Sequence, residues 1–132
     1  MENKLIEHIK KDNSCIVLKG VSGEAITEAE DTLALKFSDE YRAMLKEYGT
    51  ILVSNHEIIG LGSSKRLDVV YNTLTERSIS KDFPSDQYVI EETGMDGIVI
   101  TQDKTGTIYQ YLQDSPLIKV ADSLLEYLYK TN

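Results

Sequence analysis

The apolar residues of this chain change their spacing once, near Pro84, and that change limits the folds open to it. Before Pro84 they mostly recur every three or four positions, which is the spacing of one helix face. After Pro84, apolar and polar residues alternate in short segments, which is the pattern of half-buried strands. Since the strands cluster instead of alternating with helices, the pattern predicts an α+β fold rather than a doubly wound one.

Capping residues place the helices of the first part of the chain. Ser22 can cap a helix over 24–33, and Ser38 can cap the next one, because a serine oxygen accepts a hydrogen bond from the first helical turn. Gly49 is expected to end that second helix in the left-handed conformation. Five helices are predicted in total, over residues 2–11, 24–33, 38–48, 64–77 and 121–130.

The last two of these helices carry further expectations. A capping box of Ser123 and Glu126 is expected to open the C-terminal helix. In the helix over 64–77, one face is apolar at helical spacing and is predicted to turn toward the core. The residues of that predicted inner face are Leu67, Val70, Tyr71 and Leu74.

The strands are predicted as one short hairpin and one meander. The hairpin falls within residues 50–62 and turns at Ser54 and Asn55, and the meander strands are 87–92, 97–103 and 107–114. Asp103 and Gly106 suit the last tight turn, and Pro116 is predicted to end the strand region. Residues 1–132 are therefore expected to form one α+β domain, a small antiparallel or mixed sheet packed with four to five helices.

The net charge of −8 limits the ligand classes. Nucleic acids and anionic membranes attract basic proteins, so neither is expected as a partner. A basic protein is the partner that this charge favours. No segment approaches the roughly 20 apolar residues of a membrane helix, and the first residues lack the apolar core of a signal peptide, so a cytoplasmic protein is expected.

Groups for catalysis or metal binding are few. The chain has one cysteine, Cys15, and two histidines, His8 and His56. Cys15 lies in an apolar segment without an adjacent histidine, so it is predicted to be a buried side chain rather than a nucleophile. No catalytic residue, cofactor or metal site is predicted, and the chain is not expected to be an enzyme.

The segment Gly60–Lys65, "GLGSSK", is the nearest approach to a phosphate-binding loop. It combines small residues, a lysine and a following helix, but it lacks the spacing of a Walker motif. We interpret it as a connection in which Ser63 or Ser64 caps the next helix. Binding of a nucleotide or phosphosugar at Lys65 remains the alternative for an enzyme or small-ligand protein.

The candidate binding residues come from an acidic segment. Residues 82–103 contain six acids and no lysine or arginine. A negative surface on two strands and their turns would speed the encounter with a basic partner. The residues proposed to contact that partner are Glu91, Glu92, Asp96 and Asp103. A solvated surface without a partner is the alternative.

A longer pattern resembles a known family. The chain contains "I-x-x-x-E-x-x-L-x-x-x-F-x-x-x-Y-x-x-x-L-x-x-Y-G" from Ile26 to Gly49, which is similar to the opening motif of the SUKH superfamily. The resemblance continues in order through most of the residues up to Tyr129. Ala34 and Ser38 stand where the typical pattern has glycine and proline.

The resemblance implies a binding protein. The superfamily includes fungal regulators of cell-wall synthesis and many bacterial immunity proteins, which bind a cognate toxin, often a nuclease, and block it. The chain is accordingly expected to neutralise a toxin by non-covalent occlusion. A regulatory or scaffold module that binds a cellular client is the alternative. The resemblance supplies no set of binding residues that can be transferred to this sequence.

Overall fold

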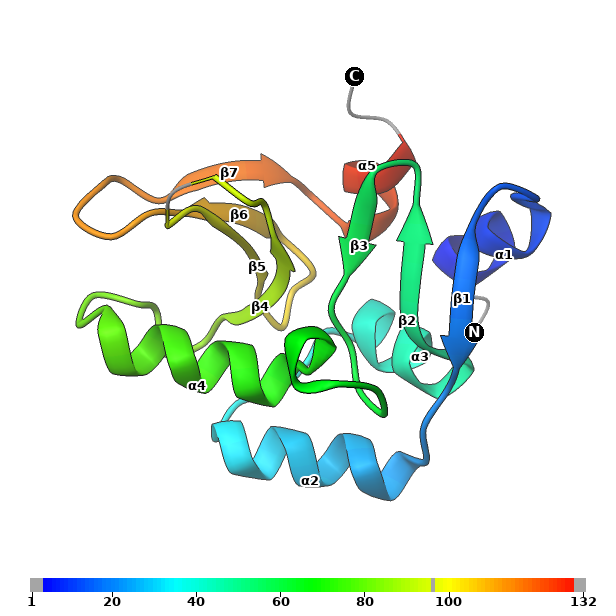
Figure 1. The fold of residues 1–132 in the computed structure, drawn as a ribbon, viewed down its shortest axis with the longest axis horizontal. Helices are drawn as coiled ribbons and strands as arrows, with labels where there is room; N and C mark the ends of the chain where they lie inside the picture. Colours follow the sequence, from blue (N-terminus) through cyan, green and yellow to red (C-terminus); the bar gives the residue numbers. More distant parts are fainter. Residues whose placement is uncertain (1–3, 96, 130–132) are drawn as a thin grey trace.

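The first part of the chain forms a three-stranded antiparallel sheet with two helices behind it (Figure 1). The computed structural model describes residues 4–95 and 97–129. The strands are β1 (Ile16–Lys19), β2 (Tyr48–Val53) and β3 (His56–Ile58), in the order β1-β2-β3. The helices α1 (Lys4–Lys11) and α3 (Asp39–Glu47) pack together, and α3 contacts β2. The predicted hairpin at residues 54 and 55 is confirmed.

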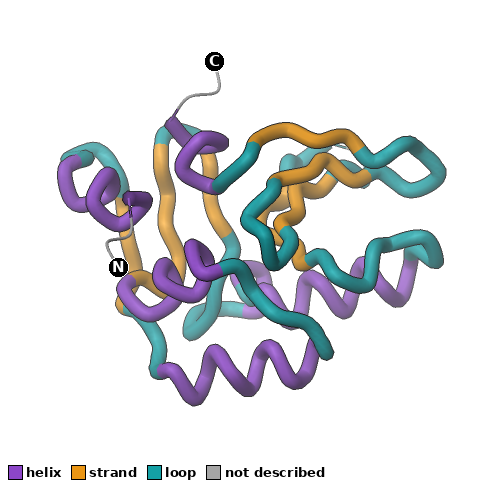
Figure 2. Tube along the Cα trace, turned by 180° about the vertical axis from the view of Figure 1, so that it is seen from behind, coloured by secondary structure: helices purple, strands orange, loops and turns teal. Residues whose placement is uncertain are grey.

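The second part forms a four-stranded antiparallel meander. Its strands are β4 (Tyr88–Glu92), β5 (Val99–Gln102), β6 (Ile108–Tyr111) and β7 (Ile118–Ala121), in sequence order. The prediction that Pro116 ends the strand region is wrong, because β7 follows it and pairs with β6. Figure 2 shows the strands as two separate groups. They meet where the Ile59 N–H donates to the Ile90 carbonyl at 2.8 Å, beside a register shift in β4.

Three further helices complete the α+β fold, which confirms the predicted class. They are α2 (Gly23–Leu33), α4 (Val69–Ile79) and α5 (Leu124–Tyr129). Helix α4 packs against β4 and α2 packs against α4, whereas α5 contacts α1 and β7. No helix in residues 4–95 and 97–129 is long and apolar enough to cross a membrane.

The helix caps agree with the sequence at three sites and differ at one. Ser22 Oγ accepts from the Ala25 N–H at 3.1 Å, Ser38 Oγ accepts from Tyr41 at 3.0 Å, and Ser123 Oγ accepts from Glu126 at 3.1 Å. For α4, however, the cap is not a serine. The residues of this cap are Asp68 as acceptor and Val70 and Tyr71 as backbone donors.

The face of α4 that packs on the sheet is not the predicted one. The buried residues of α4 are Val69 and Thr73, and the Thr73 hydroxyl accepts from the Val89 N–H at 3.0 Å. The inward orientation predicted for Tyr71 and Leu74 is therefore wrong, since Tyr71 is 48% exposed and Leu74 is 41% exposed. Leu67, before the helix, is buried as predicted.

Gly49 does not end α3 in the left-handed conformation, so the conformation predicted for this glycine is wrong. Helix α3 passes directly into β2, and the cap residue Tyr48 is extended. Gly49 has another reason to be glycine: a Cβ there would lie 2.4 Å from the Leu61 carbonyl oxygen and 2.7 Å from that of Lys19. The left-handed cap occurs instead at Ala34, which ends α2 with φ 56° and ψ 43°.

Two carboxylates, the buried Glu30 and the half-buried Glu40, hold the helices together. Glu30 is 2% exposed, accepts from the Phe37 N–H at 2.9 Å and forms an ion pair with Arg42, so it fixes the connection from α2 to α3. Glu40 accepts from the Leu124 and Leu125 N–H groups at 2.7 and 3.0 Å. A residue of α3 thereby satisfies the free backbone donors at the start of α5.

Replacing Ala34 with glycine is expected to stabilise the protein. The left-handed conformation costs a residue with a Cβ roughly 1–2 kcal/mol, and the added backbone entropy of glycine offsets about 0.5–1 kcal/mol of the relief. Ala34→Gly should thus raise the free energy of unfolding by about 0.5–1 kcal/mol in urea denaturation.

The matched control is Ala43→Gly in the interior of α3, where the backbone is right-handed. It should lower the same free energy by about 1 kcal/mol. Equal destabilisation by both substitutions would contradict the assignment of left-handed strain to Ala34.

Candidate functional site

Glu91, the first of the four predicted contact residues, points into the molecule. It is 6% exposed. Its carboxylate accepts a hydrogen bond from the Tyr127 hydroxyl and lies 3.1 Å from His56 Nδ1. The rings of His56 and Tyr127 lie 4.8 Å apart. Burial and the neighbouring Glu91 carboxylate raise the pKa of the Tyr127 hydroxyl well above its usual range. Glu91 therefore joins α5 to the β2–β3 hairpin through contacts of its carboxylate within the protein.

Asp103 is also turned inward and serves the β5–β6 turn. It is 9% exposed. One carboxylate oxygen accepts a hydrogen bond from the Thr105 N–H at 3.0 Å, and the other accepts one from the Tyr109 hydroxyl at 3.1 Å. The predicted turn is confirmed, since the Gly106 N–H donates to the Asp103 carbonyl at 3.0 Å. Asp96, the third predicted contact, lies outside the residues that the structure describes.

Glu92 is the exposed member of the set, and it faces a second acid. Glu76 on α4 interacts electrostatically with Glu92 on β4. Partial burial raises the pKa of both carboxyl groups, and the charge of Glu92 further raises the pKa of Glu76. Within residues 4–95 and 97–129, neither carboxylate forms an ion pair. This flank of α4, which we call the acidic flank, therefore carries two charges without a counter-ion.

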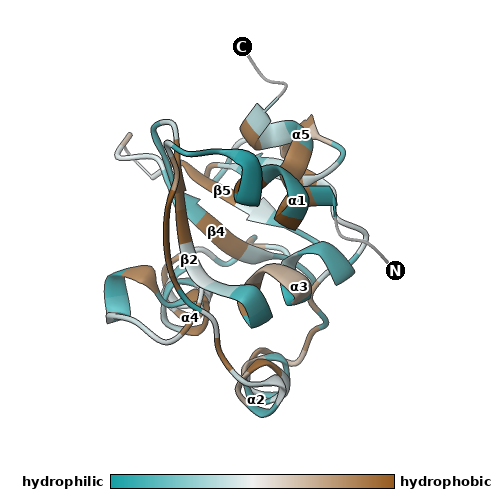
Figure 3. Cartoon of the chain, turned by 90° about the vertical axis from the view of Figure 1, so that its right-hand side faces the viewer, coloured by the Kyte–Doolittle hydropathy of each residue, from teal (hydrophilic) through white to brown (hydrophobic). Residues whose placement is uncertain are grey.

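The other flank of α4 faces α2 across an open groove of about 520 Å³. Figure 3 shows the two helices nearly end-on at the lower edge of the molecule. The walls of the groove are mainly apolar, with small side chains on α2 and larger side chains on α4. The lining residues that matter for its shape are Ala25, Ala29, Leu61, Val70, Tyr71 and Leu74.

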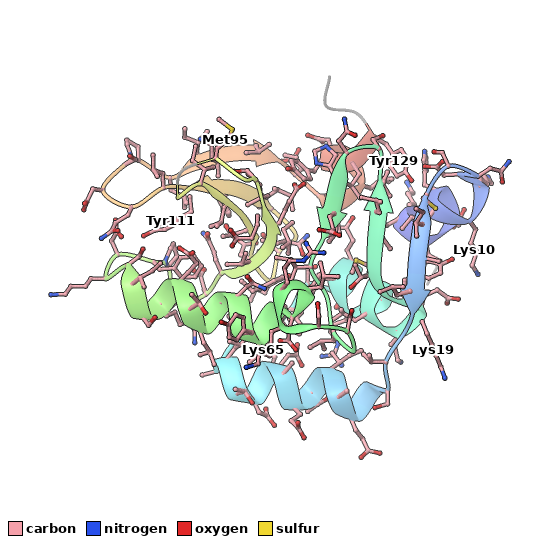
Figure 4. The ribbon with its side chains drawn as sticks, in the orientation of Figure 1. Lys10, Lys19, Lys65, Met95, Tyr111 and Tyr129 are labelled. Carbon is pink, nitrogen blue, oxygen red and sulfur yellow. The ribbon has the colours of Figure 1, made fainter. Side chains whose placement is uncertain are left out.

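The α2 side of this groove is acidic. Glu28 lines the groove, and Glu24 and Asp31 lie beside it on one continuous surface of α2. Helix α2 contains no lysine or arginine. On the opposite side, the Lys65 ammonium lies 5.7 Å from the centre of the Tyr71 ring, between the two helices (Figure 4). The groove lining thus combines apolar walls with two acids, Glu28 and Asp68, and one base, Lys65.

The start of α4 is not open to a phosphate beside the segment Gly60–Lys65. A short 3₁₀ helix (Lys65–Leu67) follows the segment, α4 comes next, and the Val70 and Tyr71 N–H groups at the start of α4 donate to the Asp68 carboxylate. A phosphate there would meet a negative charge where the helix start otherwise attracts anions. The predicted serine cap is wrong as well, because Ser64 makes no side-chain cap hydrogen bond.

Other reactive groups are also committed to structure. The Cys15 thiol donates to the carbonyls of Ile9 and Asp12, and burial raises its pKa, which disfavours the reactive thiolate. Within residues 4–95 and 97–129, no group of three or more His, Cys, Asp or Glu side chains is arranged to hold a metal ion.

The groove is the feature that sequence reasoning missed. The apolar spacing in residues 64–77 was compatible with an inward face. Asp68 is the signal for the true start of α4, because its negative charge also suits a helix start. The inward face of α4 depends on long-range contacts such as that of the Thr73 hydroxyl with the Val89 N–H, and no local signal in the sequence reveals it.

The family model described as "SUKH_5: SMI1-KNR4 cell-wall" matches residues 2–131. A search of curated proteins found no match.

The neighbours Glu91 and Glu92 should respond oppositely to neutralisation. Glu91→Gln removes a buried charge that two side chains bind, so it should lower the free energy of unfolding by about 1–3 kcal/mol. Glu92→Gln should raise it at pH 7, because the ionised form of Glu92 is disfavoured in the folded protein. Urea denaturation of both variants measures these changes.

The gain from Glu92→Gln should also depend on pH with a definite sign. Since the folded pKa of Glu92 lies above its ordinary value of 4.5, the folded state binds more protons between those values. Stability of the parent protein then falls as pH rises through this window. The advantage of Glu92→Gln should disappear below pH 4.5. An advantage that persists there, or a loss at neutral pH, would contradict the description of the acidic flank.

Proposed function

The chain belongs to the SMI1-KNR4 family, and from this membership we propose that it is an immunity protein that binds and neutralises a toxin domain. The proposed mechanism is non-covalent occlusion of a basic active site or substrate groove on the toxin. Family membership carries the proposal, since immunity proteins are a known role in this family. The net charge of −8 supports a basic partner, because opposite charge accelerates the encounter.

The acidic flank of α4 is the proposed first contact. Glu76 and Glu92 repel each other in the free protein, and a lysine or arginine of the toxin placed near both would relieve that repulsion. A nuclease binds its substrate through cationic groups that neutralise phosphates. A carboxylate pair in the same place would compete with the nucleic acid. Contact of the partner with Asp96 stays a prediction, as does contact with Glu92.

Glu91 and Asp103 take a different part in this proposal. Their carboxylates are bound inside the protein, so they would position β4 and the β5–β6 turn instead of touching the toxin. The inner side chain of the Glu91–Glu92 pair holds the strand, and the outer one is available to the partner.

A regulatory or scaffold module is the second candidate. The description of the family model includes the words "cell-wall", which support a cellular client as the alternative to a toxin. Both candidate functions rely on binding a protein and not on catalysing a reaction. They differ in whether the chain protects a cell from a toxin domain encoded beside it.

Charge reversal on the acidic flank should slow association with the toxin. We expect Glu76→Lys and Glu92→Lys together to lower the association rate constant by about tenfold or more at low salt, with a smaller effect at high salt. The measurement is stopped-flow or surface-plasmon kinetics against the C-terminal domain of the protein encoded next to this chain. Survival of cells that co-produce both proteins gives the matching readout.

The control is Glu7→Lys on α1, an exposed acid away from α4. A single reversal at Glu92 compared with that at Glu7 also keeps the net charge change equal. Protection without dependence on Glu76 and Glu92 would remove the acidic flank from the proposal. Absence of binding and of protection would overturn the immunity function and favour the client-binding alternative.

A further inference from the structure

We propose that the groove between α2 and α4 binds a basic amphipathic helix of the partner protein. This inference rests on the proposed function to the extent that the chain binds a protein, and it names the chemistry of the bound segment. The groove lies on one side of α4 and the acidic flank lies on the other. A partner that lies across the exposed face of α4 would reach both.

The apolar floor of the groove fits large side chains entering from outside. Ala25 and Ala29 leave space on α2, whereas Tyr71 and Leu74 stand up on α4 and are 48% and 41% exposed. Covering apolar surface of this kind stabilises a complex by about 25 cal/mol per Å² before the costs of association. An incoming leucine or phenylalanine would contact both walls.

The shape of the groove favours a helix as the occupant. Helices α2 and α4 have 11 residues each, so the groove runs for roughly 16 Å, or about three helical turns. Two helices side by side present the surface into which an amphipathic helix packs its apolar face. The bound segment would present apolar residues at positions i, i+3 or i+4, and i+7.

Charge determines which amphipathic helix fits. Glu28 and Asp68 line the groove, and Glu24 and Asp31 lie four and three residues from Glu28 on the adjoining surface of α2. Lysines or arginines at the same spacing on the bound helix would face them. Lys65 is the one base of the described groove lining, and its contact with the Tyr71 ring holds it to the α4 side. Two acids in the lining and two beside it, against one base, favour a basic occupant.

The same charges argue against a second copy of this chain. Each copy carries a net charge of −8, and an α2–α2 arrangement would bring two acidic surfaces together. Like charges placed face to face across an interface cost several kcal/mol and oppose association. A basic heterologous partner has the opposite balance.

Two synthetic helices test the inference directly. Both peptides have about 15 residues and the same leucine positions, and the remaining positions are lysine-rich in one and glutamate-rich in the other. Fluorescence anisotropy with the whole chain should show the lysine-rich peptide binding with a Kd at least about tenfold lower. Leu74→Ser and Glu28→Lys should each raise that Kd by about tenfold.

Matched variants separate the groove from general acidity. Ile79→Ser changes a residue of the same helix that is 62% exposed and outside the groove lining, and Glu7→Lys repeats the charge reversal on α1. Neither should alter peptide binding beyond about twofold. Circular dichroism and thermal unfolding check that all four variants remain folded, as expected for exposed positions.

Three results would overturn the inference. They are equal binding of both peptides, equal effects of groove and control variants, and a monomer–dimer equilibrium in sedimentation that Leu74→Ser abolishes. If toxin protection survives Leu74→Ser and Glu28→Lys unchanged, the groove proposal fails and the immunity function stands. If the groove binds the basic peptide but no toxin is neutralised, the immunity function fails and the groove stands.

Discussion

A buried hydrogen-bond network at the start of α3 joins the two halves of the fold. The Ser38 N–H donates to the Tyr88 hydroxyl at 2.9 Å, and that hydroxyl donates to Gln102 Oε1 at 2.7 Å. The Gln102 amide donates in turn to Glu40, the residue that caps α5. A proline at position 38 would lack the N–H, which gives the serine a structural reason. Leaving one such buried group unpaired costs about 1–3 kcal/mol.

This network matters for binding because it fixes the second sheet relative to the helices. Tyr88 begins β4, and β4 carries Glu92 opposite Glu76 of α4. The bond from Val89 to Thr73 gives α4 its polar inner contact. With that side committed to the sheet, the apolar Tyr71 and Leu74 remain in the groove toward α2. The acidic flank and the groove are two consequences of the same placement of α4.

Local chemistry explains what the sequence predicts well, and distant contacts explain where it fails. Ser22 and Ser38 cap helices through bonds to residues three positions on, so their signals are readable. Gly49 and Glu91 depend on residues brought near only by folding: the Leu61 and Lys19 carbonyls, and Tyr127 with His56. The proposed binding surface depends on which face of α4 packs on the sheet, and the contact of Thr73 with Val89 that orients this face joins residues far apart in the sequence.

Hydrogen–deuterium exchange of the chain, alone and bound to its partner, tests the central claim that α4 is the centre of the binding surface. The account predicts slower exchange on binding in residues 23–33 and 69–79, the helices on either side of the groove. Slower exchange confined to α1 (residues 4–11) and to β1 (residues 16–19), the edge strand of the first sheet, would contradict it.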